Sequence, residues 1–200
     1  MFGLPVATAI SQPLPKKAVY RKFNLKASER ERFDADISRL TLVARISSAT
    51  VPALTEGNKI KGLYVLQVVL KHKEYDAKNI LLLNKLIPQH IVFALQYVGQ
   101  TQLCIFHTRL QQSAWRPTEA TVIPLQGLNI DDVWNNIVAS IGSLNVSSEE
   151  TIEQQIINRE QKEKLLRQIE VLEKKCRLEK QTRKKYEFHQ ELLKLKSLIQ

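Results

Sequence analysis

The sequence predicts a mixed α/β fold of the α+β-like kind: a five-stranded mixed sheet with flanking helices, then a long C-terminal helix or a helical hairpin. Segments with the two-residue period of strands alternate with helical segments. A strand–helix–strand unit around residues 62–97 implies a right-handed parallel crossover. Residues 151–200 contain no Gly or Pro, as expected for long helices. We therefore expect a mixed-sheet domain over residues 1–146, beginning with an extended arm, and a charged coiled-coil tail over residues 147–200.

Two short helices are expected before the first strand. Residues 1–15 carry three prolines and predict an irregular, extended arm. Residues 16–23 follow a proline and place their apolar side chains on one face, which predicts an amphipathic helix with a basic exterior. Residues 28–38 have apolar residues four and three apart and predict a second helix.

The sheet is predicted from alternating or continuous apolar segments with turn residues between them. The five expected strands span residues 40–46, 62–70, 91–97, 102–108 and 121–125. Asp76 caps a helix that runs to Ile87, and Asn129 caps another that runs to Ile141. Residues 98–101 form a hairpin turn, which makes the third and fourth strands antiparallel neighbours.

The tail carries two apolar stripes with the spacing of coiled-coil seams. They are Leu165, Ile169, Leu172 and Cys176, and then Phe188, Leu192, Leu195 and Ile199. The two stripes do not share one register. Either a single helix is interrupted near residues 177–187, or two helices fold back on each other around residues 179–184. Both possibilities call for a partner face, and the eight residues are the candidate partner-binding set.

The net charge of +10 is concentrated near the two ends of the chain. Residues 16–45 and residues 151–200 each carry a net +5, and the stretch between them is neutral. This distribution favours polyanionic partners such as the DNA or RNA backbone, although a solvated, solubilising surface would have the same composition. The candidate phosphate contacts lie on the first helix and on the loop after the second strand: Lys16, Lys17, Arg21, Lys22, Lys71 and Lys73.

Several classes of protein are not expected from this sequence. The longest apolar runs are about five residues, far below the roughly 20 that a membrane-spanning helix needs, so no membrane contact is predicted. The first residues lack the charge order of a secretory signal. Cys104 and Cys176 are too far apart in sequence and setting to suggest a disulfide framework or a cysteine zinc site. We expect a cytoplasmic protein.

The sequence contains no motif that identifies a reaction. Phosphate-binding glycine loops and the nucleophile elbow of hydrolases are absent. The four histidines have no neighbouring ligand at metal-binding spacing, so neither a metal nor a cofactor is predicted. Enzymatic activity is left open, with a binding role favoured.

A divergent or degenerate restriction-type nuclease is the enzymatic alternative. Such a core needs an acid near one strand end and an acid-x-Lys pair on the next strand, because carboxylates hold Mg²⁺. Lys71 follows the second strand suitably, but positions 67 and 69 are Gln and Val. The carboxylates would have to come from elsewhere, such as Glu56, Glu74 or Asp76.

Motifs along nearly the whole chain resemble one family. They are Phe2-Gly3-Leu4-Pro5, Leu14-Pro15-Lys16-Lys17 with Tyr20, Lys22 and Phe23, Val65–Lys71, Leu86–Tyr97 and Leu178-Glu179-Lys180-Gln181. Together they resemble an uncharacterised bacterial family, domain of unknown function 4391. The resemblance implies a prokaryotic cytosolic protein encoded near helicases and DNA methyltransferases of restriction-like or antiviral defence clusters. It supplies no catalytic residues.

These observations predict a non-catalytic accessory or adaptor protein of a DNA-processing, restriction-like or defence complex. The basic helix would contact phosphates, and the coiled-coil tail would dock a protein such as a helicase or methyltransferase subunit, or a second copy. The divergent nuclease and a scaffold that binds no nucleic acid are the alternatives.

Overall fold

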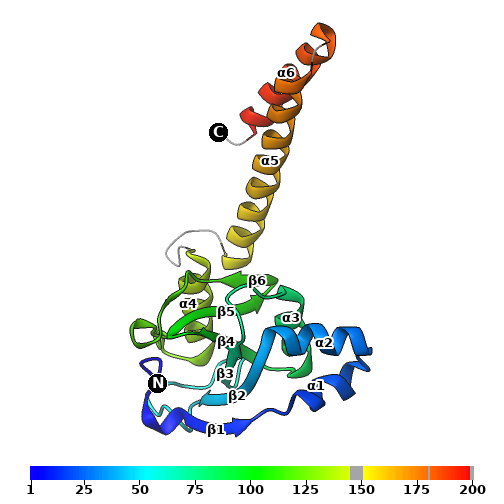
Figure 1. Ribbon diagram of the computed structural model, residues 1–200. Helices are drawn as coiled ribbons and strands as arrows, with labels where there is room; N and C mark the ends of the chain where they lie inside the picture. The colour runs from blue at the N-terminus through cyan, green and yellow to red at the C-terminus, as the bar shows by residue number, and fades with distance from the viewer. Residues whose placement is uncertain (145–150, 180, 199–200) are drawn as a thin grey trace. The chain divides into compact units, whose positions relative to one another are not determined.

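The computed structural model describes residues 1–144, 151–179 and 181–198. Contacts divide the chain into two compact units, residues 1–147 and residues 148–200. The first unit is a mixed sheet with helices on both faces, and the second is helical (Figure 1). The predicted mixed α/β fold class is therefore confirmed.

The sheet has seven strands in the order β1-β2-β3-β4-β5-β6, and β7 also pairs with β5. The strands are β1 (Ala9–Pro13), β2 (Ile37–Ile46), β3 (Leu63–Leu70), β4 (His90–Tyr97), β5 (Gln100–His107), β6 (Arg109–Gln112) and β7 (Arg116–Pro117). Only β3 and β4 are parallel, and α3 (Ala77–Leu86) connects them as the predicted crossover. At the β4–β5 hairpin, Val98 and Gly99 both have positive φ angles of 40° and 72°, which suits a tight two-residue turn.

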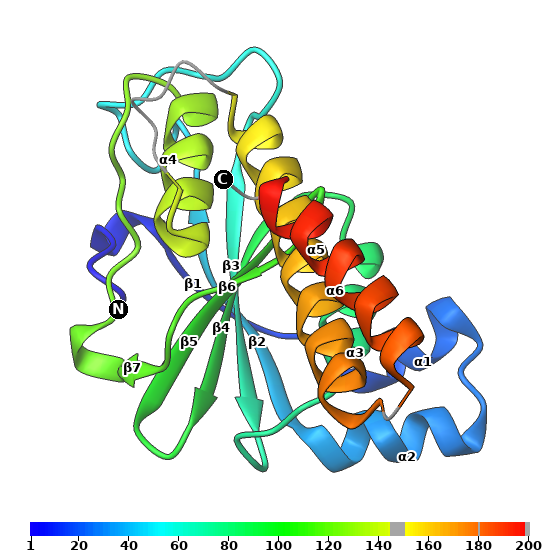
Figure 2. The same ribbon diagram turned by 90° about the horizontal axis from the view of Figure 1, so that it is seen from above.

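Three helices cover one face of the sheet. They are α1 (Lys16–Phe23), α2 (Ala27–Asp36) and α3. Their buried side chains join those of the strands in one apolar cluster that includes Val19, Phe33, Leu66 and Phe93. Figure 2 shows these helices on one side of the sheet and α4 (Ile130–Gly142) on the other. The central strands β3, β4 and β5 are largely buried, as two-sided cover requires, whereas the edge strand β1 is mostly exposed.

Helix α4 packs on only one end of its face of the sheet. Trp134 of α4 lies edge-on to the His90 ring at the start of β4, with 4.9 Å between ring centroids. It also contacts His107 at the end of the antiparallel neighbour β5. The opposite end of this face, where β3 finishes and β5 begins, extends beyond these contacts.

The connection between β2 and β3 is fastened to α4. The Asp131 carboxylate accepts hydrogen bonds from the backbone N–H groups of Lys59 (3.1 Å) and Ile60 (2.8 Å). Partial burial would raise the pKa of Asp131, but the bonds from Lys59, Ile60 and Asn58 outweigh it and lower the pKa.

Some sequence predictions need correction. Residues 121–125 form no strand: Thr121 and Ile123 are buried, which produces an alternating pattern, but the Ile123 N–H bonds to the Phe2 carbonyl and Pro124 has no N–H to donate. The sheet has seven strands rather than five, because part of the N-terminal arm forms β1 and the short β6 and β7 also join. Helix α2 ends at Asp36, so β2 begins three residues earlier than expected.

The second unit contains α5 (Ile152–Leu178) and α6 (Thr182–Ser197). The chain turns back between them, and α6 returns along α5, as Figures 1 and 2 both show. Lys196 of α6 pairs with Glu173 of α5 at 2.8 Å, and the Cys176 thiol contacts the Lys185 carbonyl at 3.7 Å. Of the two possibilities left open by the sequence, the structure has the helical hairpin. No helix among the described residues has the length and apolarity to cross a membrane.

Candidate functional site

Lys16 fixes the basic helix α1 to the rest of the domain. Its ammonium donates hydrogen bonds to the Asp34 carboxylate at 2.7 Å and to the Ile37 carbonyl, and its side chain is only 22% exposed. The Tyr20 hydroxyl donates to the same carboxylate at 2.6 Å. The sequence predicts a phosphate contact for Lys16, but these two hydrogen bonds of its ammonium give it a structural role at this position.

Electrostatics favour the charged form of Asp34. Partial burial would raise the pKa of this carboxyl, but the hydrogen bonds from Lys16 and Tyr20 and the nearby charges of Lys16 and Lys71 outweigh burial and lower the pKa. Burial and the bond to Asp34 raise the pKa of the Tyr20 phenol. The Lys16–Asp34–Tyr20 cluster therefore keeps its ionised acceptor at neutral pH and holds α1 against α2.

The other three basic residues of α1 point to solvent. Lys17, Arg21 and Lys22 are exposed, and none of their side chains forms a hydrogen bond or an ion pair with any residue that the structure describes. The buried Val19 lies on the opposite side of the helix. One exposed face of α1 thus carries three cations on a helix that Lys16 anchors.

Lys71 and Lys73 lie in the loop between β3 and α3 and differ in their contacts. Lys73 donates to the Gln100 side chain at 3.0 Å and lies over the Trp115 ring at 5.5 Å from its centroid. The Lys71 side chain is exposed and has no bonded partner among the described residues, while its backbone N–H bonds to the Asp36 carbonyl. Of the loop pair, Lys71 is the cation available to a ligand.

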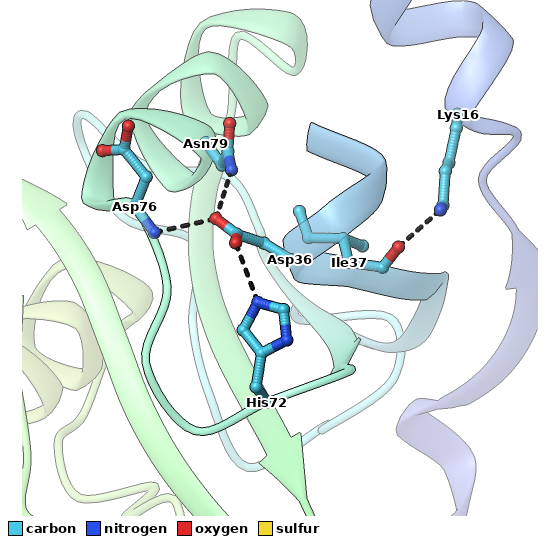
Figure 3. A network of polar contacts seen from close by, with 6 residues as sticks. All are labelled: Lys16, Asp36, Ile37, His72, Asp76 and Asn79. Atoms are coloured by element: carbon cyan, nitrogen blue, oxygen red, sulfur yellow. Dashed lines mark hydrogen bonds and ion pairs between the residues drawn. The ribbon is translucent and has the colours of Figure 1, made fainter. Parts of the chain in front are cut away.

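Asp36 organises the start of α3 (Figure 3). One carboxylate oxygen accepts from the Asp76 backbone N–H at 2.8 Å and from the Asn79 side chain at 2.7 Å; the other lies 3.1 Å from His72 Nε2. Asp76 itself caps the helix by accepting from the Lys78 N–H, as the sequence predicts. A carboxylate of the protein therefore occupies the helix N-terminus where a bound anion would be stabilised.

A cavity of about 580 Å³ opens beside Lys71, at the carboxyl ends of β3 and β4. Its lining also includes Val69, Gln96, Thr118 and Glu119. This end of parallel strands, beside a crossover, is where open α/β sheets place their ligands. The volume is in the range of sites that hold a group the size of one nucleotide.

Strands β2 and β3, which would carry a nuclease centre, have no acidic residues at the facing positions beside Lys71. Arg39 of β2 lies opposite Val69 of β3, and Thr41 lies opposite Gln67. Among the suggested carboxylates, Asp76 caps α3, Glu74 is exposed, and Glu56 belongs to the β2–β3 connection at the other end of β3 from Lys71. Among the described residues, no group of three His, Cys, Asp or Glu side chains is placed to hold a metal ion.

Cys104 and His90 are held in their uncharged forms by their surroundings in the fold. Burial raises the pKa of the Cys104 thiol to about 12, so it stays protonated. Partial burial and the nearby His107 lower the pKa of His90 against the opposing effect of Asp131, which favours a neutral imidazole beside the Trp134 ring.

In the helical hairpin, the described members of both predicted seams lie inward. Ile169 and Leu192 are buried, and Leu165, Leu172, Cys176, Phe188 and Leu195 are half-buried. Ile199 lies outside the described residues. Packing of α5 on α6 uses these positions, whereas Tyr186 and Leu193, seven residues apart on one face of α6, remain 65% and 51% exposed.

Together these features define a mixed α/β domain with an anchored basic helix, an open crevice at its parallel strands and a charged helical hairpin. The chain belongs to the family described as Domain of unknown function (DUF4391), whose model matches residues 2–198. Comparisons with curated proteins and with solved structures each gave no match.

Proposed function

We propose that the chain is a non-catalytic accessory or adaptor protein of a bacterial, cytoplasmic DNA-processing, restriction-like or antiviral defence complex. In this role α1 contacts nucleic-acid phosphates and the helical hairpin docks a partner subunit, such as a helicase or methyltransferase. The observation that carries the proposal is the exposed trio Lys17, Arg21 and Lys22. These cations lie on a helix whose fourth cation, Lys16, anchors it to Asp34 and to the Ile37 carbonyl.

Phosphate contact by this trio predicts salt-dependent binding. Each phosphate contact releases counterions, so replacing Lys17, Arg21 and Lys22 together by Ala should weaken binding about tenfold or more at 50 mM salt. The slope of log affinity against log salt should fall by about 2 to 3. Fluorescence anisotropy of labelled oligonucleotides with the full-length chain, at several salt concentrations, measures both quantities.

The matched control removes the same charge elsewhere. Lys59, Lys61 and Lys85 are exposed and lie outside α1, and replacing them by Ala lowers the net charge equally. This variant should bind within about twofold of the wild-type chain, since none of these three lysines belongs to the proposed contact surface of α1. Equal losses in the two triple variants, or no binding by the wild-type chain at 50 mM salt, would exclude a contact through α1.

Partner docking is expected on the outward side of the hairpin, because the seam positions are occupied within it. Replacing Tyr186 and Leu193 by Glu introduces two charges on the exposed apolar side of α6. The tagged full-length chain should co-purify a helicase or methyltransferase subunit from its host, and this variant should lose that subunit.

A control variant, Lys174→Ala with Lys184→Ala, changes exposed charged positions of the same hairpin and should retain the partner. Retention of the same subunit by the Tyr186→Glu, Leu193→Glu variant would contradict docking through this face. So would a wild-type chain that co-purifies neither of the two named kinds of subunit.

A further inference from the structure

The face of the sheet opposite α1–α3 has one end that α4 does not cover. On β3, Leu66, Val68 and Leu70 belong to the apolar cluster beneath α1–α3, so Gln67 and Val69 point to the other face. The register places Thr41 and Arg39 of β2 opposite them, and Gln96 of β4 beside Val69. We call Arg39, Thr41, Gln67, Val69 and Gln96 the open quadrant.

Polar side chains occupy the centre of the open quadrant. The Gln67 amide donates through Nε2 to Gln96 Oε1 at 2.6 Å. This bond fixes both side chains and leaves the Gln67 Oε1 acceptor and the Gln96 Nε2 donor without a bonded partner among the described residues. Both glutamines are half-buried rather than covered by a helix. An adjacent acceptor and donor on fixed amides match the pairing edge of a nucleobase.

Cations flank this amide pair. Arg39 is exposed, and its guanidinium has no bonded partner among the described residues. Lys71 lines the cavity that Val69 and Gln96 also border. Glu119, which follows β7 in the chain, also lines this cavity. The charge next to the amides is therefore positive on the strand side, as expected for a surface that meets phosphates.

A sheet surface that no helix covers restricts which form of nucleic acid can bind there. Bases in a duplex are accessible only from its grooves, into which a helix or a two-stranded ribbon fits, but half-buried amides on a broad sheet do not. An unpaired strand can lay its bases on such a surface and leave its phosphates at the flanks.

We propose that the open quadrant binds single-stranded nucleic acid: Arg39 and Lys71 contact backbone phosphates, and the Gln67–Gln96 amide pair contacts an unpaired base. This inference rests on the proposed function and assigns it a second surface, which selects single strands while α1 supplies contacts to any phosphate backbone.

The test compares a labelled single-stranded oligonucleotide with the duplex of the same sequence, by anisotropy with the full-length chain. Replacing Arg39 by Ala should weaken single-strand binding about fivefold and reduce the salt slope by about 1. Replacing Gln67 and Gln96 together by Leu should weaken it by a similar factor without changing the slope, and duplex binding should stay within about twofold.

Arg45→Ala is the matched control for Arg39→Ala. Arg45 is an exposed cation of the same strand, but it lies over the Tyr64 ring on the face of α1–α3. The Arg45→Ala variant should bind the single strand with the same affinity as the wild-type chain. Thermal unfolding followed by circular dichroism establishes that each variant is folded.

The outcomes separate this inference from the proposed function. If the α1 triple variant loses binding while the open-quadrant variants bind single strands like the wild-type chain, the open quadrant has no such role and the proposed function stands. Equal effects of Arg39→Ala and Arg45→Ala would also overturn the inference. If the wild-type chain binds neither oligonucleotide, both proposals fail.

Discussion

Replacing Trp134 by Ala is expected to lower the free energy of unfolding by about 3 to 5 kcal/mol. Trp134 is 2% exposed and is the largest of the α4 side chains that are buried in the domain. Its ring lies edge-on to His90, and its Nε1–H donates to His107 Nδ1 at 3.4 Å. Truncation would leave a cavity beneath α4 and remove both contacts. Urea denaturation followed by circular dichroism measures the loss.

The other tryptophan provides the comparison. Trp115 is half-buried beneath the Lys73 ammonium, so Trp115→Ala should cost less than about 2 kcal/mol. Trp134→Phe keeps an aromatic ring against His90 and should cost less than Trp134→Ala. If the two alanine variants unfold at the same urea concentration, Trp134 does not hold α4 in the way described.

Replacing Asp36 by Ala should lower the free energy of unfolding by about 2 to 4 kcal/mol. The carboxylate is only 14% exposed and connects the end of α2 to the start of α3. Its loss would leave the buried Asn79 amide and the Asp76 N–H without their acceptor. Urea denaturation again gives the value.

Glu74→Ala removes an exposed carboxylate from the neighbouring loop and should change stability by less than about 0.5 kcal/mol. Asp36→Asn keeps one side-chain oxygen as an acceptor, so its loss of unfolding free energy should lie between those of Asp36→Ala and Glu74→Ala. A stability change for Asp36→Ala no larger than that for Glu74→Ala would contradict the role given to Asp36.

The sequence predicted those parts of the fold that depend on local patterns. The crossover from β3 through α3 to β4, the hairpin at Gly99 and the Asp76 and Asn129 caps all follow from periodicity or from cap and turn chemistry. The failed strand at residues 121–125 has the correct burial pattern but no sheet neighbour, and pairing depends on distant parts of the chain.

The candidate site was predictable only in part, for a similar reason. The exposed cations of α1 follow from its amphipathic pattern, but the anchoring of Lys16 depends on Asp34, which lies 18 residues further along the chain. The role of Asp36 in joining α2 to α3 does not follow from the sequence, because its partners lie in the β3–α3 loop and α3. The Gln67–Gln96 pair forms only when the parallel register of β3 and β4 is known.

The position of Asp36 also bears on how selective the protein can be toward polyanions. An internal anion already neutralises the positive pole of α3, so an incoming phosphate gains nothing from that dipole. Attraction of phosphates must then come from lysine and arginine side chains, whose length lets them adapt to many geometries of the nucleic-acid backbone. On this basis, any discrimination between targets comes from uncharged groups, while the speed of encounter follows the ionic strength.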